Sequence, residues 1–270
     1  MKNKIYDCVT FFNENFQVNL RFNILYNYVD KFVVCESRFD HKGRPKVLNF
    51  KMDQFDKFKD KIIYLVLEDQ FPNTSDPWKA QAYQREYMLE NLNEANPNDY
   101  IFFSDPDEIP KPEILVNFEL KKKYGIFLQD CFNYKFNLFN PFESPWEGTR
   151  VAKKKNLKSI DFMRQKVKIK NLEYSFFRID KEKSIQIYAK AGWHFNNVMT
   201  PDEISNKLKT FAHTEFSKEE FSSPEIIKSK IFNKIDLFNR GHQYKRINMD
   251  ESFPDFLLKN YQTYKDFILK

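Results

Sequence analysis

The fold of this chain is decided by residues 101–108, IFFSDPDE. The segment begins in a short apolar run of the kind that forms a buried strand, and the run passes directly into a cluster of acids. Asp105 and Asp107, one residue apart at the end of a strand, can converge on one cation, and short carboxylates suit Mn²⁺ or Mg²⁺. An acidic turn that starts a helix before Pro110 explains the same residues, and both interpretations stay open at this point.

Strand-like and helical runs alternate upstream of this segment. Apolar strand-like runs cover residues 5–12, 31–36 and 62–67. Apolar residues at helical spacing occur between them, at residues 15–28 and 76–93. This β-α-β order predicts an α/β fold, with a mostly parallel sheet flanked by helices. Ligands of such sheets bind beyond the carboxyl ends of the strands, where the aspartates lie.

The downstream half is less regular. We expect two strands over residues 125–138 and further β structure over residues 167–187, then helices over residues 200–211, 224–237 and 254–269. No internal repeat, low-complexity linker or composition shift divides the chain. We therefore expect a single domain over residues 1–270.

The charge distribution argues against a nucleic-acid-binding protein. Net charge is +6, but Asp and Glu are interspersed throughout, so the chain lacks the basic stripe of a nucleic-acid-binding protein. Lysine runs at residues 121–123 and 153–155 could meet a membrane surface or a phosphate-bearing ligand, although solvated faces are the simpler interpretation.

The cysteines and the hydropathy indicate a reducing compartment. Cys8 and Cys35 lie within apolar strand-like runs, and with Cys131 the count is odd and widely spaced, which predicts free thiols without a disulfide frame or zinc site. No signal peptide or membrane span is recognisable. We expect a cytoplasmic protein, with peripheral contact at the inner face of a membrane left open.

Only five glycines occur, and they form neither G-x-G-x-x-G nor a Walker A loop. A nucleotide diphosphate would therefore need another means of binding. A divalent cation held between carboxylates, which in turn binds the phosphates, is such a means.

Six segments in order resemble glycosyltransferase family 17: FFSDPDEIP at residues 102–110, DKFVVCES at 30–37, GRPK at 43–46, YQR at 83–85, AGWH at 191–194 and LLKNY at 257–261. The resemblance spans nearly the whole chain. It implies a GT-A fold, a UDP-sugar donor, a divalent metal and inversion at the anomeric carbon. It also implies a nucleotide-sugar-binding half, residues 1–110, and an acceptor-binding half with C-terminal helices, residues 111–270.

The expected reaction moves a sugar, N-acetylglucosamine from UDP-N-acetylglucosamine, onto a glycan hydroxyl. We expect no luminal anchor or stem, so the resemblance does not carry over an N-glycan acceptor. A surface polysaccharide, a lipid-linked sugar or another glycan fits equally. The alternative is a non-catalytic nucleotide-sugar- or glycan-binding module that retains the fold.

The resemblance suggests roles for the residues near the donor. Asp107 is the expected direct metal ligand, and Asp105 either shares the ion or bonds the donor ribose, whereas Glu108 is expected to be structural. Glu36 could contact uracil or ribose, or be a surface glutamate at a strand end. Arg85 could pair with the diphosphate in bidentate fashion, or form a surface salt bridge with Glu86 or Glu90.

Two histidines compete for the metal. His213 follows a predicted helix, as such ligands do in GT-A enzymes, whereas His194 lies in the G-W-H motif and is otherwise expected beside the donor. Trp193, next to His194, could stack on an acceptor sugar, although tryptophan more often packs in a core.

The catalytic base is expected at the start of a helix. Thr200 suits the N-cap, Pro201 the first helical position and Glu203 the reciprocal position of a capping box, which leaves Asp202 without a structural duty beyond the helix dipole. Asp202 is therefore the predicted base, and Glu215 is the alternative.

Overall fold

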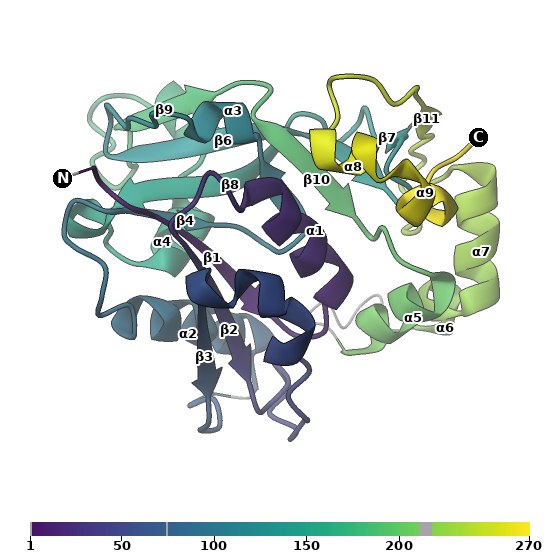
Figure 1. The fold of residues 1–270 in the computed structure, drawn as a ribbon, viewed down its shortest axis with the longest axis horizontal. Coiled ribbons are helices and arrows are strands. Elements are labelled where there is room, and N and C mark those ends of the chain that lie inside the picture. Colours follow the sequence, from purple (N-terminus) through teal and green to yellow (C-terminus); the bar gives the residue numbers. More distant parts are fainter. Residues whose placement is uncertain (1, 74, 211–217) are drawn as a thin grey trace. The chain divides into compact units, whose positions relative to one another are not determined.

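The structure is a computed structural model that describes residues 2–73, 75–210 and 218–270. The chain forms two compact units (Figure 1). The first unit comprises Met1–Gln129 and Glu147–Gly192, and the second comprises Asp130–Trp146 and Trp193–Lys270. The chain thus passes from one unit to the other three times, after Gln129, Trp146 and Gly192. The single domain with functional halves that divide near residue 110 stays a prediction.

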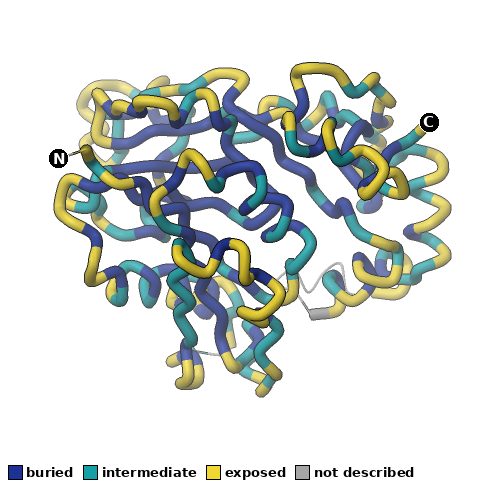
Figure 2. The backbone as a smooth tube through the Cα atoms, in the orientation of Figure 1, coloured by how far each residue is buried: buried dark blue, intermediate teal, exposed yellow. Residues whose placement is uncertain are grey.

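The sheet of the first unit is mostly parallel, as predicted for a GT-A-type α/β fold. Its four parallel strands lie in the order β3-β2-β1-β4, with bounds β1 Ile5–Phe11, β2 Lys31–Ser37, β3 Ile62–Leu67 and β4 Tyr100–Phe103. Beyond β4 follow antiparallel β8 (Trp146–Lys153) and then β6 (Tyr124–Asn133), which pairs in parallel with β9 (Ile185–Tyr188). The central strands are buried along their length (Figure 2).

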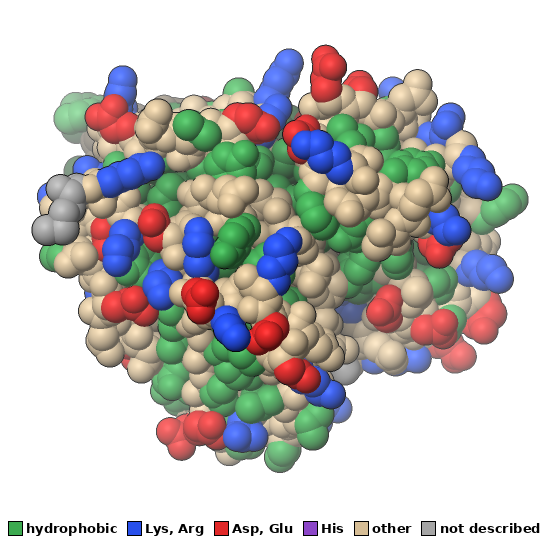
Figure 3. Space-filling view, viewed as in Figure 1, with side chains coloured by type: hydrophobic (Ala, Val, Ile, Leu, Met, Phe, Trp, Pro, Cys, Tyr) green, Lys and Arg blue, Asp and Glu red, His purple; other side chains and the backbone are tan. Residues whose placement is uncertain are grey.

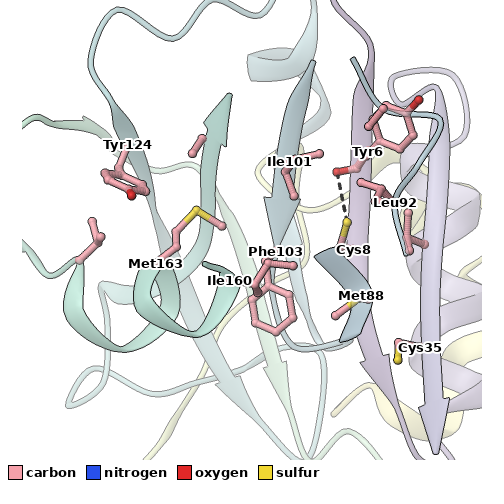
Figure 4. Close-up of a cluster of buried hydrophobic side chains, with 14 of the residues drawn as sticks. Tyr6, Cys8, Cys35, Met88, Leu92, Ile101, Phe103, Tyr124, Ile160 and Met163 are labelled. Atoms are coloured by element: carbon pink, nitrogen blue, oxygen red, sulfur yellow. Dashed lines mark hydrogen bonds between the residues drawn. The ribbon is translucent and has the colours of Figure 1, made fainter. Parts of the chain in front are cut away.

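Helices cover both faces of this sheet. On one face lie α1 (Asn15–Leu25) and the 3-10 segment η1 (Met52–Lys61), where Phe22 packs on Phe32 of β2 with ring centroids 4.2 Å apart. On the other lie α2 (Pro77–Glu90) and α4 (Ile160–Lys166). Met88 and Met163 from these helices join Cys8 and Phe103 in the cluster of buried apolar side chains drawn in Figure 4. Because side chains alternate along a strand, each strand contributes to both layers.

All three cysteines are buried free thiols, as predicted. Burial raises the pKa of Cys8 well above its ordinary value and that of Cys35 to about 12. Both thiols therefore stay protonated and act as small apolar core residues.

The predicted β structure over residues 167–187 is wrong except at its end. Residues Ile169–Glu173 form a 3-10 turn, η3, and a loop follows until β9 begins at Ile185. Pairing with β6 starts only at Ile185, opposite Tyr124. Alternating charged and apolar residues need a neighbouring strand to become β structure, and this loop has none among the described residues.

The second unit combines short strands and helices. The end of β6 pairs in parallel with β10 (Gly192–Asn196), and β7 (Leu138–Phe139) pairs with both β6 and β11 (Lys245–Arg246). Its helices include α5 Pro201–Thr210, α6 Glu219–Ser222 and α7 Pro224–Asn233. A second core gathers around Leu138, Ile204 and Ile227.

The expected single C-terminal helix is instead broken into α8 (Asp255–Lys259), α9 (Tyr261–Tyr264) and the 3-10 turn η5 (Lys265–Phe267). The break lies at Asn260, where φ is −110° and ψ is 27°. The Asn260 side chain donates a 2.8 Å hydrogen bond to the Phe256 carbonyl. Asparagine commonly competes with helical backbone bonds in this way.

Charge is evenly mixed on the face drawn in Figure 3, where Lys and Arg alternate with Asp and Glu. This agrees with the interspersed charges of the sequence. Within the part of the chain that the structure describes, no helix has the length and apolar content needed to cross a bilayer.

Candidate functional site

The two aspartates lie in a turn, residues 104–107, at the carboxyl edge of the parallel strands. β4 pairs with β1, whose other neighbour is β2, so the chain connections diverge on either side of β1. Such a switch in strand order is where open α/β sheets bind ligands. The competing helix-start interpretation is wrong, because Glu108–Pro110 forms a short strand, β5, and the next helix, α3, spans Pro112–Leu115.

Arg21 of α1 fixes the backbone of this turn. It is fully buried and forms a bidentate ion pair with Asp7 of β1, with N–O distances of 2.7 and 2.6 Å. The same guanidinium donates to the Ser104 hydroxyl at 2.7 Å and to the Glu108 carbonyl at 2.7 Å. Both ends of the turn are therefore tied to one planar, charged group, which gives strong and directional bonds.

Arg164 of α4 fixes the carboxylates of the turn. Its Nη1 donates to Glu108 Oε2 at 2.8 Å, and its Nη2 donates to Glu108 Oε1 at 2.6 Å and Asp105 Oδ2 at 2.7 Å. Burial alone would lower the pKa of Arg164, but the charges of Asp105 and Glu108 raise it above its ordinary value. Arg164 is thus a permanent cation, and buried Glu108 has the structural role expected of it.

Asp105 and Asp107 differ in how far they reach solvent. The side chain of Asp105 is 36% exposed, and Asp107 is 8% exposed. Among the described residues, no group of three or more His, Cys, Asp and Glu side chains is arranged as a metal site. Asp105 and Asp107 carry the carboxylate oxygens that a hard divalent ion prefers, and their role as metal ligands stays a prediction. The predicted ligand His213 lies outside the described residues.

Glu36 is buried at the end of β2, so its interpretation as a surface glutamate is wrong. Its carboxylate pairs with Lys46 and accepts bonds from the Asn49 and Phe50 amides at 2.8 and 3.0 Å. It also accepts from the Tyr64 hydroxyl at 2.9 Å. Glu36 thereby organises the chain that follows β2, and its contact with uracil or ribose stays a prediction.

Arg85 is buried between two helices and does not form the alternative surface salt bridge. It donates to Asp161 of α4 at 2.8 Å and to Gln81 of α2 at 2.9 Å. Its guanidinium also lies over the Phe103 ring, 5.4 Å from the centroid. Arg85 thus holds α4, the helix of Arg164, against α2, and a direct bond to the diphosphate stays a prediction.

Gly192, the glycine of the G-W-H motif, is required by its surroundings. Its φ is +146°, and a Cβ there would lie 2.1 Å from the carbonyl oxygen of Ile109 in β5. The strand that follows the aspartates therefore approaches this position too closely for any side chain.

Trp193 and His194 lie on β10 in the second unit. Trp193 is buried, and its indole N–H donates to the Ser252 carbonyl at 3.0 Å. This environment matches the core alternative and offers little ring surface to a sugar. His194 Nδ1 lies 3.7 Å from Cys131 Sγ, and its ring packs on Trp146 with centroids 4.9 Å apart. Its proposed contacts with metal or donor stay predictions.

The capping box before α5 is confirmed. The Thr200 amide donates to the Glu203 carboxylate at 2.8 Å, and the Glu203 amide donates back to the Thr200 hydroxyl at 3.3 Å. Asp202 takes no part in this pair of bonds and is exposed in the first turn. The alternative base, Glu215, lies outside the described residues.

Sequence reasoning missed the three charged residues that build the site, Asp7, Arg21 and Arg164. One signal was available: Asp7 interrupts an apolar strand, and a buried carboxylate requires a cationic partner. The identity of that partner was not readable from the sequence, because Arg21 and Arg164 meet the turn only through the tertiary fold.

Comparison with known proteins agrees with the resemblance. Residues 1–265 match the model of glycosyltransferase family 17. The rat protein named beta-1,4-mannosyl-glycoprotein 4-beta-N-acetylglucosaminyltransferase is 25% identical over 281 residues, which cover 92% of this chain and 51% of that protein. The human protein of the same name gives the same identity and coverage over 280 residues. The chain therefore spans about half the length of the curated relatives it matches.

Solved structures resemble the chain only loosely. The glycosyltransferase GlyE of Streptococcus pneumoniae is 12% identical, covering 70% of this chain and 45% of that one, with a TM-score of 0.36. A putative glucose-1-phosphate thymidylyltransferase from Bacillus anthracis is 11% identical, covering 71% and 88%, with a TM-score of 0.37. The family model, in contrast, matches all but the last few residues, and on that match the chain belongs to glycosyltransferase family 17.

Proposed function

We propose that this chain is an inverting glycosyltransferase that moves N-acetylglucosamine from UDP-N-acetylglucosamine onto a glycan hydroxyl. The observation that carries the proposal is the turn of Asp105 and Asp107 at the carboxyl edge of the parallel strands, fixed by two buried arginines. The donor sugar is proposed from the names of the 25%-identical relatives. Fold alone does not specify a substrate, so the donor needs its own test.

The proposal includes a divalent ion, Mn²⁺ or Mg²⁺, held by Asp107 and Asp105. When bound, such an ion neutralises the donor diphosphate and stabilises it as a leaving group. The chain's own contribution is preorganisation. Arg21 fixes the backbone of the turn, and Arg164 fixes one oxygen of Asp105, so the carboxylates need little rearrangement when the donor binds.

Inversion requires a carboxylate that accepts the proton of the attacking hydroxyl. Asp202 is our proposed base, because the Thr200–Glu203 capping box supplies the helix cap without it. Glu215 remains the alternative. His213 or His194 would add a ligand to the metal or a contact to the donor.

The acceptor proposed is a carbohydrate, carried by a polysaccharide, a lipid-linked sugar or another glycan. Peripheral contact with a membrane belongs to the same proposal, since a lipid-linked acceptor would be presented at a bilayer surface. The opposing possibility is a module that binds nucleotide sugars or glycans without catalysis.

Calorimetric titration of UDP-, GDP- and CMP-sugars, with Mn²⁺ or with EDTA, tests the donor and metal together. We expect binding of UDP-N-acetylglucosamine that requires the metal, followed by slow release of UDP. Tighter binding of a GDP- or CMP-sugar would exclude the proposed donor. Metal-dependent binding without UDP release, even with candidate acceptors, would identify the chain as a binding module.

A further inference from the structure

An exposed apolar loop, residues 174–183, lies between η3 and β9 of the first unit. Phe176 and Phe177 are each 87% exposed, and Ile179 is 96% exposed. They are the three most exposed large apolar side chains among the residues whose exposure is described, and they fall within four consecutive positions. Large apolar groups gathered in this way mark a surface that meets a partner, whereas single ones are ordinary.

The loop is held in one conformation by its own backbone. The Arg178 amide donates to the Ser175 carbonyl at 3.0 Å, and the Lys181 amide donates to the Arg178 carbonyl at 3.1 Å. The cations of Arg178 and Lys181 lie over the Tyr174 ring, 5.3 and 5.4 Å from its centroid. These contacts fold the polar parts of the loop on themselves and leave the apolar side chains in solvent.

Basic residues outnumber acidic ones in the segment that carries the apolar tip, although Arg178 and Lys181 both pair with Asp180. Residues 166–183 contain six basic side chains and three acidic ones. The lysine run at residues 121–123 lies at the foot of the loop, where the Lys123 amide donates to the Ser184 hydroxyl at 3.0 Å and the Lys121 amide donates to Gln186 Oε1 at 2.8 Å. The run adds three exposed cations, one of which pairs with Glu182.

We propose that loop 174–183 docks onto an anionic lipid surface. Phe176, Phe177 and Ile179 enter the boundary between headgroups and acyl chains, and the surrounding lysines bind the headgroup charge. Lysine is depleted in the cores of protein–protein interfaces but abundant where proteins meet anionic bilayers, which favours lipid over a protein partner. Exposed phenylalanine and isoleucine side chains can insert between lipids without a complementary groove.

The loop also continues from the candidate site. Helix α4 carries Arg164, which bonds Asp105, and η3 and the loop follow α4 directly along the chain. The inference deepens the membrane contact included in the proposed function and rests on it in that respect.

Sedimentation of the full chain with vesicles tests docking without donor or acceptor, so its failure is separate from failure of the transferase. We expect binding to vesicles of phosphatidylcholine mixed with phosphatidylglycerol, little binding to phosphatidylcholine alone, and weakening as salt rises. The triple variant Phe176→Ser, Phe177→Ser, Ile179→Ser should bind the anionic vesicles at least about tenfold more weakly than the wild type does. Phe232→Ser, which alters an 83% exposed phenylalanine elsewhere, should bind like the wild type.

Each contrary outcome overturns the inference. The inference is wrong if the wild-type chain stays in the supernatant with anionic vesicles. It is also wrong if the triple variant binds these vesicles as the wild type does. Self-association that the triple variant abolishes, with no vesicle binding, would make the loop a contact between copies of the chain. Circular dichroism should show that the triple variant is folded. If it is not, the single variants Phe177→Ser and Ile179→Ser should each lose part of the binding to anionic vesicles.

Discussion

Arg164 Nη2 lies 2.7 Å from Asp105 Oδ2, while the same guanidinium bonds both carboxylate oxygens of Glu108. One buried cation thus links a partly exposed aspartate of the candidate site to a fully buried glutamate. Because a movement of Glu108 would break its ion pair with Arg164, this shared cation holds Asp105 in a fixed orientation.

Replacing Arg164 with methionine should destabilise the fold and weaken donor binding. Removal of one partner from a buried ion pair typically costs about 3–5 kcal/mol, because the remaining charge is left uncompensated. Arg164→Lys keeps the charge but loses the bidentate geometry, so it should retain more stability than methionine while still weakening metal-dependent UDP-sugar binding. Urea unfolding and calorimetry measure the two effects. Donor affinity equal to wild type in both variants would refute the positioning role.

Asp107→Ala should abolish metal-dependent binding of UDP-sugars and leave the fold intact. Asp107 is the predicted direct ligand, and the sequence offers no glycine-rich phosphate loop to replace it. Asp56→Ala is a matched control, because the Asp56 side chain is 75% exposed on η1 of the same unit and should leave donor affinity unchanged. Calorimetry with Mn²⁺ measures both variants, and wild-type affinity in Asp107→Ala would contradict the assignment.

Gly192→Ala should destabilise the chain more than Gly241→Ala. Both glycines have positive φ, +146° and +79°, so alanine strains the backbone at either position. A Cβ at Gly192 would also lie 2.1 Å from the Ile109 carbonyl, whereas a Cβ at Gly241 would meet nothing within 4 Å. Gly241→Ala should therefore cost about 1 kcal/mol and Gly192→Ala clearly more. Equal unfolding midpoints would show that the clash at Gly192 relaxes freely.

His41 should make the free energy of unfolding depend on pH. Burial lowers the pKa of His41 below its usual 6.5, although a hydrogen bond with Gln84, at 3.0 Å, opposes the shift. The unfolded chain therefore binds a proton at a higher pH than the folded chain does. The stabilisation is fully present above pH 6.5 and is lost progressively as pH falls below it.

The comparison of wild type with His41→Gln isolates this contribution, because the other histidines titrate in both chains. Urea midpoints measured between about pH 5 and 8 should fall more steeply with acid in the wild type than in the variant. Parallel curves would show that His41 is equally basic in the folded and unfolded chains.

Local sequence patterns predicted the part of the fold that holds the aspartates. Alternating apolar runs located β1, β2, β3 and β4, and helical spacing located α1 and α2. Asp76, where the predicted helix begins, caps α2, since its side chain accepts a 3.0 Å bond from the Trp78 amide. These features depend on residues close in sequence, so periodicity and capping rules describe them well.

The prediction was weaker where distant residues decide the structure. Arg21 binds Glu108 and Arg164 binds Asp105 across many tens of residues, and no spacing rule connects them. The same reason explains the mistaken strand over residues 167–187. Phe176 and Ile179 have strand-forming character, but they are solvent-exposed, and only Ile185 onward pairs with β6. Strand propensity expresses packing against neighbours, which local sequence does not contain.

The last prediction concerns the catalytic base. The capping box of Thr200 and Glu203 is formed as expected, so Asp202 is not needed to start α5. Its position in the first turn gives it a helix-dipole interaction of about 0.3–1 kcal/mol, which explains an acidic residue there without catalysis. If Asp202 accepts the acceptor's proton, Asp202→Asn should reduce turnover by roughly a hundredfold or more, with donor affinity nearly unchanged.

Glu203→Gln is a suitable control, because it alters the neighbouring acid and keeps a side chain that can serve the capping box. UDP release and donor calorimetry on each variant separate turnover from binding. Normal turnover in Asp202→Asn, together with an inactive Glu215→Gln that still binds donor, would assign the proton transfer to Glu215.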